Sequence, residues 1–549
     1  MMKNIFSVMV LLLISFQTKA QLKNDYVSIE KTIDRPNLVV GVVVDQMRYD
    51  YLYRFYNKYG DGGFKRLMRE GFNCENTHFN YVPTYTAVGH TSIYTGTTPS
   101  MHGIIGNDWY DKILKKSIYC VDDDRYKTIG ANKGGKKSPF RLQTTTITDQ
   151  LKLITKGEGK VIGISLKDRA AILPSGHNAD AAYWFQGKEE GKFITSSFYM
   201  NSLPKWVKKF NKSNVVEKLM KDWNTLYDIK IYSESIDDNN DYEKKYKGES
   251  SPVFPHKFSK IRYKNNNYDL LKASPYGNTL IVDFVEAAIN GENLGNNKMT
   301  DFLTISFSST DYIGHMFGPD SKEIEDAYIR LDKDIENLLL ILDKKIGKGN
   351  YSLFLTADHA AAPIPAYLNS QKINAGYFNK KGFKKYINNV AEKYFNSLEI
   401  IENISNYQIF LNIDKLEGLG LNYSEVVNTI KNKAILFDGV YKTVTAETLQ
   451  TASFNDVTIS AVQNGYNQKY SGDVIIIPMP AMLYKKMKGT SHGTSYSYDT
   501  HVPLIFFGKG FKHGSTKKHI PIVDIAPTIS NLLKIEFPNA CTGKIINIP

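Results

Sequence analysis

The chain has 549 residues, of which 42% are hydrophobic and 23% are charged, and its formal net charge is +13 at pH 7. This composition excludes a disordered chain and a membrane bundle, and the length predicts one large domain with insertions or several domains. The lysines are scattered along the chain, which favours a general preference for small anions over a nucleic-acid-binding groove.

The N-terminus predicts export. Residues 1–20 contain Lys3, an apolar core from Ile5 to Phe16, and the small-x-small cleavage site Thr18-Lys19-Ala20. This is the pattern of a cleaved secretory signal peptide. The apolar run is too short to span a bilayer comfortably, and no Cys follows it as a site for a lipid anchor. We therefore expect a periplasmic or secreted protein without a membrane anchor.

Cysteine is rare in this sequence. The only cysteines are Cys74, Cys120 and Cys541, so an exported protein of this sequence can form one disulfide within the chain. The sequence does not determine which two of them would pair. No two of them have the spacing of zinc ligands, which argues against a structural zinc knuckle.

Four apolar runs predict the strands of a central, mostly parallel sheet. Near-continuous β-branched and aromatic residues are typical of parallel strands that are buried on both faces. Helical patterns lie between the runs, so we expect an α/β fold. The strands cover residues 37–44, 160–165, 301–307 and 351–356, and the helices cover 143–155, 275–290 and 324–343.

Two segments differ in character from this core. Residues 186–275 are rich in charges, Asn and Tyr, and residues 365–475 contain their own amphipathic helices near 381–397 and 423–434. We interpret both as insertions that cap a single catalytic domain spanning residues 21–549.

The stretch Tyr81–Gly96, YVPTYTAVGHTSIYTG, is rich in hydroxyl groups and nearly free of charge. Pro83 ends any preceding helix, so a new helix is expected to begin near Tyr85. Thr84 or Thr86 would then lie at its N-terminus, where unpaired N–H groups favour an oxyanion. A hydroxyl there is a nucleophile if its proton is removed, although a simple N-cap is the more common role of Thr.

Acidic residues and histidines follow three of the four strands. Asp45 ends the first strand, Asp311 and His315 follow the third at i and i+4, and Asp358-His359 follow the fourth. In open α/β sheets ligands gather at the carboxyl ends of the strands. One such pair would be a weak signal, but two pairs together with Asp45 indicate a metal site.

Two further motifs complete the candidate site. Lys167-Asp168-Arg169 lies just past the second strand, where a Lys and an Arg can grip a phosphate group. His492 lies among small residues in Gly489–Thr494, and His501 is its rival as a late ligand. The ligand candidates offer only oxygen and nitrogen, a mixture that suits two zinc ions bridging a phosphate group.

The order of these motifs resembles the alkaline phosphatase superfamily. It is most similar to the Thr-nucleophile bacterial alkaline phosphatases of the PafA type. The matching segments are VVVDQMRYDYL (42–52), NYVPTYTAVGHTSIYTG (80–96), HGIIGN (102–107), LKDRAAILPSGH (166–177), DYIGH (311–315), TADH (356–359) and SHGTSYSYDTHVP (491–503).

The resemblance implies an alkaline phosphatase that hydrolyses small-molecule phosphate monoesters with two Zn²⁺ ions, and we expect a monomer that binds no nucleic acid. It implies Thr86 as the nucleophile, which would contact one zinc ion, and Asn107, Lys167 and Arg169 as catalytic groups that bind the phosphoryl oxygens. It places the zinc ion next to Thr86 on Asp45, Asp358 and His359, and the other on Asp311, His315 and His492.

Three alternatives remain open on the sequence. The first is a phosphodiesterase or nucleotide pyrophosphatase of the same superfamily, whose sites lack the Lys-x-Arg pair. The second is a sulfatase, which would need a C/S-x-P-x-R signature that VPTYTAVGH does not contain. The third is a non-catalytic binding protein with a decayed site, which the presence of all six ligand candidates argues against.

Overall fold

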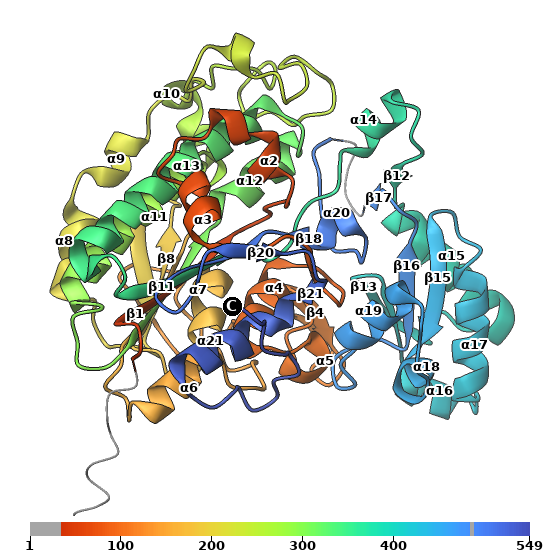
Figure 1. The fold of residues 1–549 in the computed structure, drawn as a ribbon. Helices are drawn as coiled ribbons and strands as arrows, with labels where there is room; N and C mark the ends of the chain where they lie inside the picture. The colour runs from red at the N-terminus through yellow and green to blue at the C-terminus, as the bar shows by residue number, and fades with distance from the viewer. Residues whose placement is uncertain (1–33, 484–487, 549) are drawn as a thin grey trace, which may run out of the picture. The chain divides into compact units, whose positions relative to one another are not determined.

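A ten-stranded mixed sheet forms the centre of the fold in the computed structural model (Figure 1). The structure describes residues 34–483 and 488–548, so the predicted signal peptide at 1–20 lies outside the described residues. The described residues from Pro36 onward form one compact unit. In spatial order the strands are β20 (Gly514–Thr516), β2 (Phe72–Cys74), β19 (Leu504–Gly508), β11 (Tyr351–Thr356), β1 (Leu38–Val44), β10 (Asp301–Phe307), β7 (Val161–Ser165), β8 (Ala181–Gln186), β9 (Lys192–Ser196) and β6 (Thr128–Ile129).

The five central strands, β11, β1, β10, β7 and β8, are parallel. The strands beyond them add antiparallel pairs on both sides. Every residue of β1 is buried, as its LVVGVVV sequence predicts for a strand covered on both faces. The predicted α/β class is therefore confirmed, with the parallel core in the middle of a mixed sheet and one further parallel pair, β2 with β20, at its edge.

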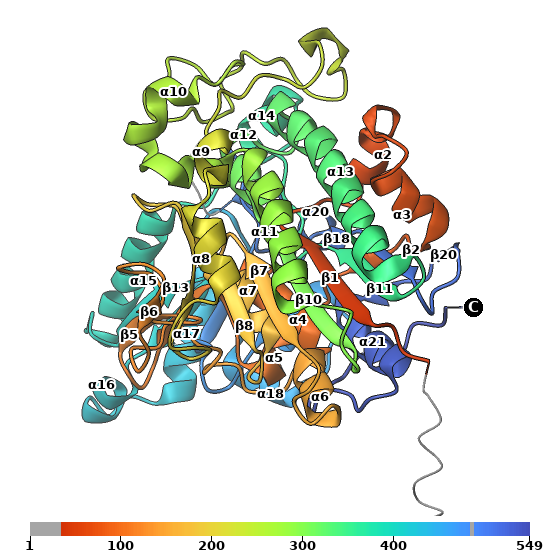
Figure 2. The same ribbon diagram turned by 90° about the vertical axis from the view of Figure 1, so that its left-hand side faces the viewer.

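Helices cover both faces of this sheet (Figures 1 and 2). On one face pack α8 (Lys205–Lys212), α11 (Tyr276–Glu292) and α13 (Lys322–Leu342), and on the other α4 (Thr86–Thr95), α6 (Ile147–Ile154), α7 (Asp168–Ser175) and α21 (Ile525–Leu533). Other helices of the core are α2 (Tyr51–Arg54), α3 (Phe64–Glu70), α5 (Pro99–His102), α12 (Ser309–Phe317), α14 (Pro365–Ser370) and α20 (Ser497–Thr500).

Small sheets of two or three strands lie outside the main sheet. The three-stranded one has β3 (Thr77–His78) between β18 (His501–Val502) and β21 (Ile520–Pro521), and the two-stranded ones are β4 (Asp108–Asp111) with β5 (Lys116–Tyr119) and β12 (Gly376–Tyr377) with β17 (Met482–Leu483).

The segment predicted as the second insertion builds a sheet of its own, with a separate buried apolar cluster that includes Phe383, Ile387, Ile409 and Ile430. Its strands are β13 (Ile401–Ser405), β14 (Gln408–Leu411), β16 (Val474–Pro478) and β15 (Val440–Thr445). Its helices are α15 (Lys380–Phe395), α16 (Ile413–Gly418), α17 (Tyr423–Ala434), α18 (Ala446–Thr451) and α19 (Val457–Gly465). The exact insertion boundaries stay predictions.

The segment predicted as the first insertion is dominated by short helices and loops. Besides α8 it contains α9 (Val215–Leu219) and α10 (Phe258–Ile261). Its side chains bond to α13, for example the indole N–H of Trp223, which donates to Asp326 Oδ2 at 2.6 Å.

None of the helices in the described part of the chain combines the length and the apolar character needed to cross a bilayer. The thiols of Cys74, Cys120 and Cys541 are all free, so the one disulfide that the sequence allowed is not formed.

Candidate active site

The parallel strands place the predicted site residues at one edge of the sheet. Asp45 directly follows β1, and Asp358 lies just past the end of the neighbouring strand β11. Asp311 lies in α12 after β10, and Lys167 follows β7, the strand on the far side of β10. Because these strands run in the same direction, their carboxyl ends bring together four residues that are far apart in the sequence.

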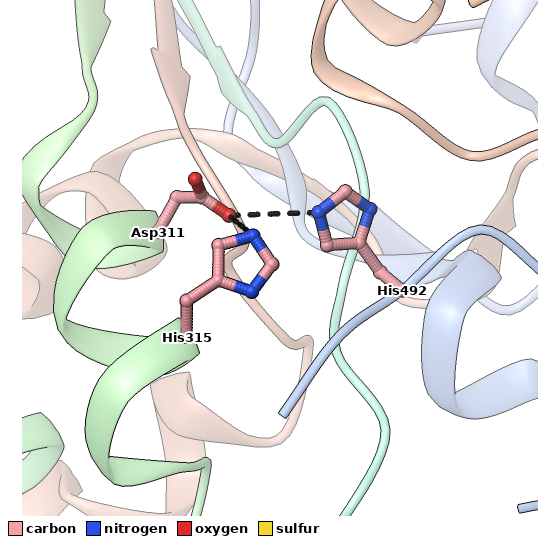
Figure 3. Close-up of side chains that lie close together, drawn as sticks. All are labelled: Asp311, His315 and His492. Atoms are coloured by element: carbon pink, nitrogen blue, oxygen red, sulfur yellow. Dashed lines mark ion pairs between the residues drawn. The ribbon is translucent and has the colours of Figure 1, made fainter. Parts of the chain in front are cut away.

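Two groups of side chains there have the geometry of metal sites. In each group, one candidate ligand atom per residue lies within 4.8 Å of the others. The first group is Asp45, Asp358 and His359, and the second is Asp311, His315 and His492. Figure 3 shows the second group, with Asp311 and His315 on helix α12 and His492 reaching them from a separate loop.

The histidines of both groups are oriented by their backbone contacts. The Nδ1 atoms of His359, His315 and His492 lie 3.0, 2.9 and 2.6 Å from the carbonyl oxygens of Ala360, Thr490 and Thr84. A carbonyl only accepts, so each Nδ1 carries the proton and each Nε2 keeps its lone pair. A backbone contact on the other ring nitrogen is the usual support of a metal-ligating histidine.

The first group also leaves polar atoms without partners. Asp45 Oδ1, Asp358 Oδ2 and His359 Nε2 are fully buried and form no hydrogen bond. His359 Nε2 lies 3.6 Å from Asp45 Oδ1 and 3.5 Å from Asp358 Oδ2. Burial lowers the pKa of His359 to about 3, so the imidazole is neutral and does not compensate the carboxylates. Buried oxygen and nitrogen lone pairs that converge in this way fit a divalent cation.

Lys167 joins the two groups. Its Nζ lies 2.6 Å from Asp45 Oδ2 and 2.6 Å from Asp311 Oδ2. Burial favours the neutral amine, but the carboxylates of Asp311 and Asp45 outweigh it and hold the pKa of Lys167 above its usual value. The side chain is therefore a buried ammonium placed between the two groups.

Thr86 lies beside this ammonium, with its Oγ1 at 3.5 Å from Lys167 Nζ. It is the first residue of α4, whose N-cap is Tyr85. Thr84 is placed differently, because its hydroxyl donates to the carbonyl of Thr494 at 3.1 Å. Of the two threonines, Thr86 is the one whose hydroxyl faces the ligand groups.

The other two predicted phosphoryl-binding residues are Asn107, which contacts the first turn of α4, and Arg169, which lies in α7. Asn107 Oδ1 accepts the N–H of Ala87 at 2.9 Å, and its side chain lines a pocket of about 220 Å³ together with His315 and His492. Arg169 Nη1 donates to the hydroxyl of Tyr119 at 3.0 Å, while its buried Nε has no partner.

His501 lies outside both metal groups. It is in β18, its ring stacks on Tyr49 and His78, and its Nε2 lies 3.1 Å from the carbonyl oxygen of Glu75. The structure thus places His492, and not its rival, beside Asp311 and His315.

Sequence reasoning missed two residues that support the ligands. Gln46 donates from Nε2 to Asp311 Oδ1 at 2.6 Å and from its backbone N–H to Asp358 Oδ1 at 3.1 Å, which links the two groups. Asp499 Oδ2 accepts from the backbone N–H groups of Gly493 and Thr494 at 3.0 and 2.8 Å, which holds the loop that carries His492. In the sequence, the only sign of Gln46 or Asp499 is that each lies close to a predicted ligand motif.

Two glycines of the motifs lie where another part of the chain comes very close to their Cα atoms. A Cβ at Gly89 of α4 would lie 2.0 Å from the carbonyl oxygen of Asp358. A Cβ at Gly314 would lie 1.9 Å from Gln46 Oε1. Position 89 requires glycine because the neighbour is backbone, whereas a Cβ at Gly314 would displace the Gln46 amide from its contact with Asp311.

Fold and site together define a member of the alkaline phosphatase superfamily. The chain belongs to its type I phosphodiesterase / nucleotide pyrophosphatase family, whose family model matches residues 39–502.

The relatives are similar over nearly the whole chain. A protein of Myroides odoratus named calcium-transporting ATPase is 48% identical over 93% of this chain and 94% of its own. Alkaline phosphatase PafA of Elizabethkingia meningoseptica is 46% identical over 94% of each chain. The crystal structure of wild-type alkaline phosphatase PafA superposes with a TM-score of 0.91 at 45% identity, covering 94% of this chain and 99% of that one. The expected likeness to the PafA-type enzymes is confirmed.

Proposed function

We propose that this protein is an exported alkaline phosphatase that hydrolyses small-molecule phosphate monoesters through a phosphothreonine intermediate on Thr86. One observation carries the proposal: the two ligand groups adjoin at Lys167, within reach of the Thr86 hydroxyl. A phosphoryl group placed at this point would meet a nucleophile, a cation and two metal-binding groups at once.

The reaction would proceed in two displacements. The Thr86 oxygen forms a bond to phosphorus while the bond from phosphorus to the ester oxygen breaks, and the proton of Thr86 is lost to solvent. The departing alkoxide leaves with a proton as an alcohol. Water then attacks the phosphothreonine, which releases inorganic phosphate and restores the hydroxyl.

Two Zn²⁺ ions fit the donor set. Asp45, Asp358, His359 and the Thr86 hydroxyl would hold one, and Asp311, His315 and His492 would hold the other. Three of these donors are imidazole nitrogens, which favours zinc over a hard cation that prefers oxygen alone. When bound, zinc supplies Lewis acidity, which lowers the pKa of a coordinated hydroxyl and neutralises charge on the leaving oxygen.

Asn107, Lys167 and Arg169 are the residues proposed to bind the phosphoryl oxygens. Lys167 offers a point charge, whereas Arg169 offers a planar fork of N–H donors. The contact from Ala87 N–H fixes the oxygen of the Asn107 amide, which turns its N–H₂ group away from the backbone of α4. These donors would favour a dianionic monoester, because each unsubstituted oxygen accepts a charge-assisted hydrogen bond.

The family description supports a second candidate, a phosphodiesterase or nucleotide pyrophosphatase. An ATPase activity, as in the name of the Myroides relative, would also transfer a phosphoryl group to water. The same site could perform all three reactions, so substrate preference distinguishes them. The Lys167–Arg169 pair is the feature that favours the monoester.

The experiment that tests the proposal compares matched substrates on purified protein. Rates are measured on an aryl phosphate monoester, the corresponding diester and ATP, with the zinc content of the same sample determined. A monoester rate well above the diester rate, with about two zinc ions per chain, supports the proposal. A faster diester reaction would favour the second candidate. Secretion of the intact chain and its mass in solution test the expected export and monomeric state.

A further inference from the structure

The active site opens into a pocket of about 220 Å³ that the proposed mechanism uses only in part. Three of the residues that line it already have a role: His315 and His492 are candidate ligands, and Asn107 is proposed to bind the phosphoryl group. The other residues of the lining are Tyr85, Asp108, Asn406 and Ser491. They lie where they contact the part of a ligand that extends beyond the phosphoryl group.

The in-line geometry of phosphoryl transfer identifies that part. The attacking and leaving oxygens lie on opposite sides of phosphorus. The proposed function places the attacking Thr86 oxygen with the group at Asp45, and the leaving oxygen with the group that contains His315 and His492. The pocket is lined by these two histidines and not by Thr86. It is therefore the place where the alcohol part of a phosphate ester lies, an assignment that rests on the proposed function.

Asp108 contributes a carboxylate to this pocket. It is the first residue of β4, directly after Asn107, and its side chain is exposed. Within the described part of the chain, its carboxylate forms no hydrogen bond and no ion pair. At alkaline pH the group is an anion that can only accept hydrogen bonds. A ligand that fills the pocket therefore meets two unused acceptor oxygens at Asp108.

Asn406 reaches the pocket from the second insertion. It is one of the two residues that join β13 to β14, and both have the positive φ angles of a tight hairpin loop, 50° at Asn406 and 59° at Tyr407. Asn406 Nδ2 donates to the backbone carbonyl of Asp108 at 2.7 Å, which ties the tip of the hairpin to the start of β4. Figure 1 shows β13 beside β4. Because this contact fixes the orientation of the amide, Asn406 Oδ1 is an acceptor without a partner among the described residues.

The lining decides which kind of alcohol fits. Among the described residues that line the pocket there is no lysine or arginine, so no side chain there attracts a second anion. The ring of Tyr85, edge-on to that of His492 with centroids 5.7 Å apart, adds an apolar wall for a carbon skeleton. The volume of about 220 Å³ is below the roughly 300–1,000 Å³ of pockets that hold drug-sized ligands. The pocket thus suits a small group with hydroxyl donors.

We propose that this pocket binds the small, uncharged alcohol part of a polyol phosphate, and that Asp108 and Asn406 recognise its hydroxyl groups. Glycerol phosphates and sugar phosphates belong to this class. Each hydroxyl would donate to the Asp108 carboxylate or to Asn406 Oδ1. An alcohol part with a negative charge of its own, such as a carboxylate or the diphosphate of ATP, would be repelled by Asp108 and bind less well. The second insertion would then supply a residue that determines specificity.

The test compares three primary alkyl phosphates on the purified full chain with its active-site metal retained, at alkaline pH. Ethyl phosphate has no hydroxyl on its alcohol part, glycerol phosphate has two, and the matching phosphoglycerate has a carboxylate in place of a hydroxymethyl group. Because the three esters differ in intrinsic reactivity, ratios of kcat/KM are compared between wild type and variants. The Ki of inorganic phosphate, which has no alcohol part, reports phosphoryl binding by itself.

Asp108→Asn should raise the ratio of phosphoglycerate to glycerol phosphate by about threefold or more, the scale of an exposed charge contact. A relative gain on one substrate is a result that a loss of structure would not give. Asp122→Asn is the matched control, because the charge of Asp122 acts on Asp108, but Asp122 pairs with Lys137 and does not line the pocket. This control should leave the ratio unchanged.

Asn406→Gly removes the amide and keeps the hairpin turn, because glycine adopts a positive φ without strain. It should lower the ratio of glycerol phosphate to ethyl phosphate by about twofold to tenfold, the range for one lost hydrogen bond, with the Ki of phosphate unchanged.

Three results would overturn the proposal. The first is a set of ratios that neither variant changes. The second is the same shift in Asp122→Asn as in Asp108→Asn, which would mean a general effect of charge. The third is a raised Ki of phosphate in Asn406→Gly with unchanged ratios, which would mean that the hairpin only supports Asn107. Wild-type protein that hydrolyses none of the three esters would instead contradict the proposed function, and the assignment of the pocket would fall with it.

Discussion

The imidazole rings of His359 and His492 stack with their centroids 3.5 Å apart and their planes inclined by 13°. His359 belongs to the first ligand group and His492 to the second. The predicted insertion at 365–475 separates these residues in the sequence, so the contact forms only when the core sheet and the chain beyond the insertion are both in place. The stacked pair is therefore a direct contact between the two ligand groups.

The first prediction concerns the late ligand. His492→Ala should lower bound zinc from about two ions per chain to about one, because the group at Asp311 keeps only two protein ligands. His501→Ala is the matched control, since His501 lies in β18 against Tyr49 and His78. Metal analysis of both variants after dialysis checks this. A loss of zinc in His501→Ala alone would exchange the two roles.

The second prediction concerns metal removal. Chelation should abolish phosphatase activity, and Zn²⁺ should restore it better than Mg²⁺, because Mg²⁺ prefers oxygen ligands in an octahedral arrangement. Rates on a phosphate monoester, measured after each metal is added back, provide the test. Full activity of the metal-free protein would contradict the two-metal proposal.

The third prediction concerns the nucleophile. Thr86→Ala should lower kcat on a monoester by about three orders of magnitude or more, the scale expected when a nucleophile is removed. Its zinc content should stay nearly unchanged, because three other ligands hold the adjacent metal. An acid quench with labelled substrate should trap the phosphoryl group on wild type and not on the variant.

Thr84→Ala serves as the control for that experiment. It removes the hydrogen bond from the Thr84 hydroxyl to the Thr494 carbonyl, which contributes about 1 kcal/mol to stability. The backbone carbonyl of Thr84 that holds His492 remains. Retained activity is therefore expected, and an inactive Thr84→Ala beside an active Thr86→Ala would move the nucleophile to Thr84.

The fourth prediction concerns Asp499 as a positioning residue. Asp499→Ala leaves the N–H groups of Gly493 and Thr494 without their acceptor, at a cost of about 1–3 kcal/mol for each buried donor left unpaired. The loop of His492 should loosen, so zinc should be lost from the group at Asp311 before the group at Asp45. Asp499→Asn keeps an acceptor oxygen and should retain more metal. Equal zinc loss from both groups would indicate general destabilisation instead.

The strands of the core were predictable because a strand that is buried on both faces has apolar residues at nearly every position. The structure has β10 and β11 at the predicted residues, and β1 and β7 begin one residue later than predicted. The polar residues at their ends followed from the rule that parallel strands present ligands at their carboxyl edge. The strands β9 and β2, which lie next to the two edges of the sheet, were not predicted, because short strands carry a weaker apolar pattern.

The supporting contacts were less predictable. Gln46 contributes through one backbone and one side-chain hydrogen bond across the sheet, which no spacing in the sequence encodes. In the sequence Asp499 has no feature that distinguishes it from other acidic residues, and only the fold brings its carboxylate to the backbone N–H of Gly493. The separation of His492 from His501 required the fold as well, because both lie near small residues and only the path of the chain places one beside Asp311.

The last prediction concerns the preference for monoesters and its dependence on Lys167 and Arg169. A monoester dianion presents unsubstituted oxygens to every donor, whereas a diester carries an organic group on one of them. A lost charge-assisted hydrogen bond costs about 1.5–3 kcal/mol, and about 1.36 kcal/mol corresponds to a tenfold change in rate. Arg169→Ala should therefore slow monoester hydrolysis by about tenfold to a hundredfold and diester hydrolysis much less. The Lys167→Ala, Arg169→Ala double variant should lose more of the monoester rate, although the two effects need not add.

Lys167 also contacts Asp45 and Asp311, so its variants require a zinc measurement on the same sample. Lys137→Ala is the matched control, because Lys137 lies 3.4 Å from Asp168 and its loss removes a nearby positive charge that does not belong to the proposed phosphoryl site. Equal losses on both substrates would mean that the pair supports the fold or the metals, and a wild-type protein that is faster on diesters would favour the phosphodiesterase hypothesis.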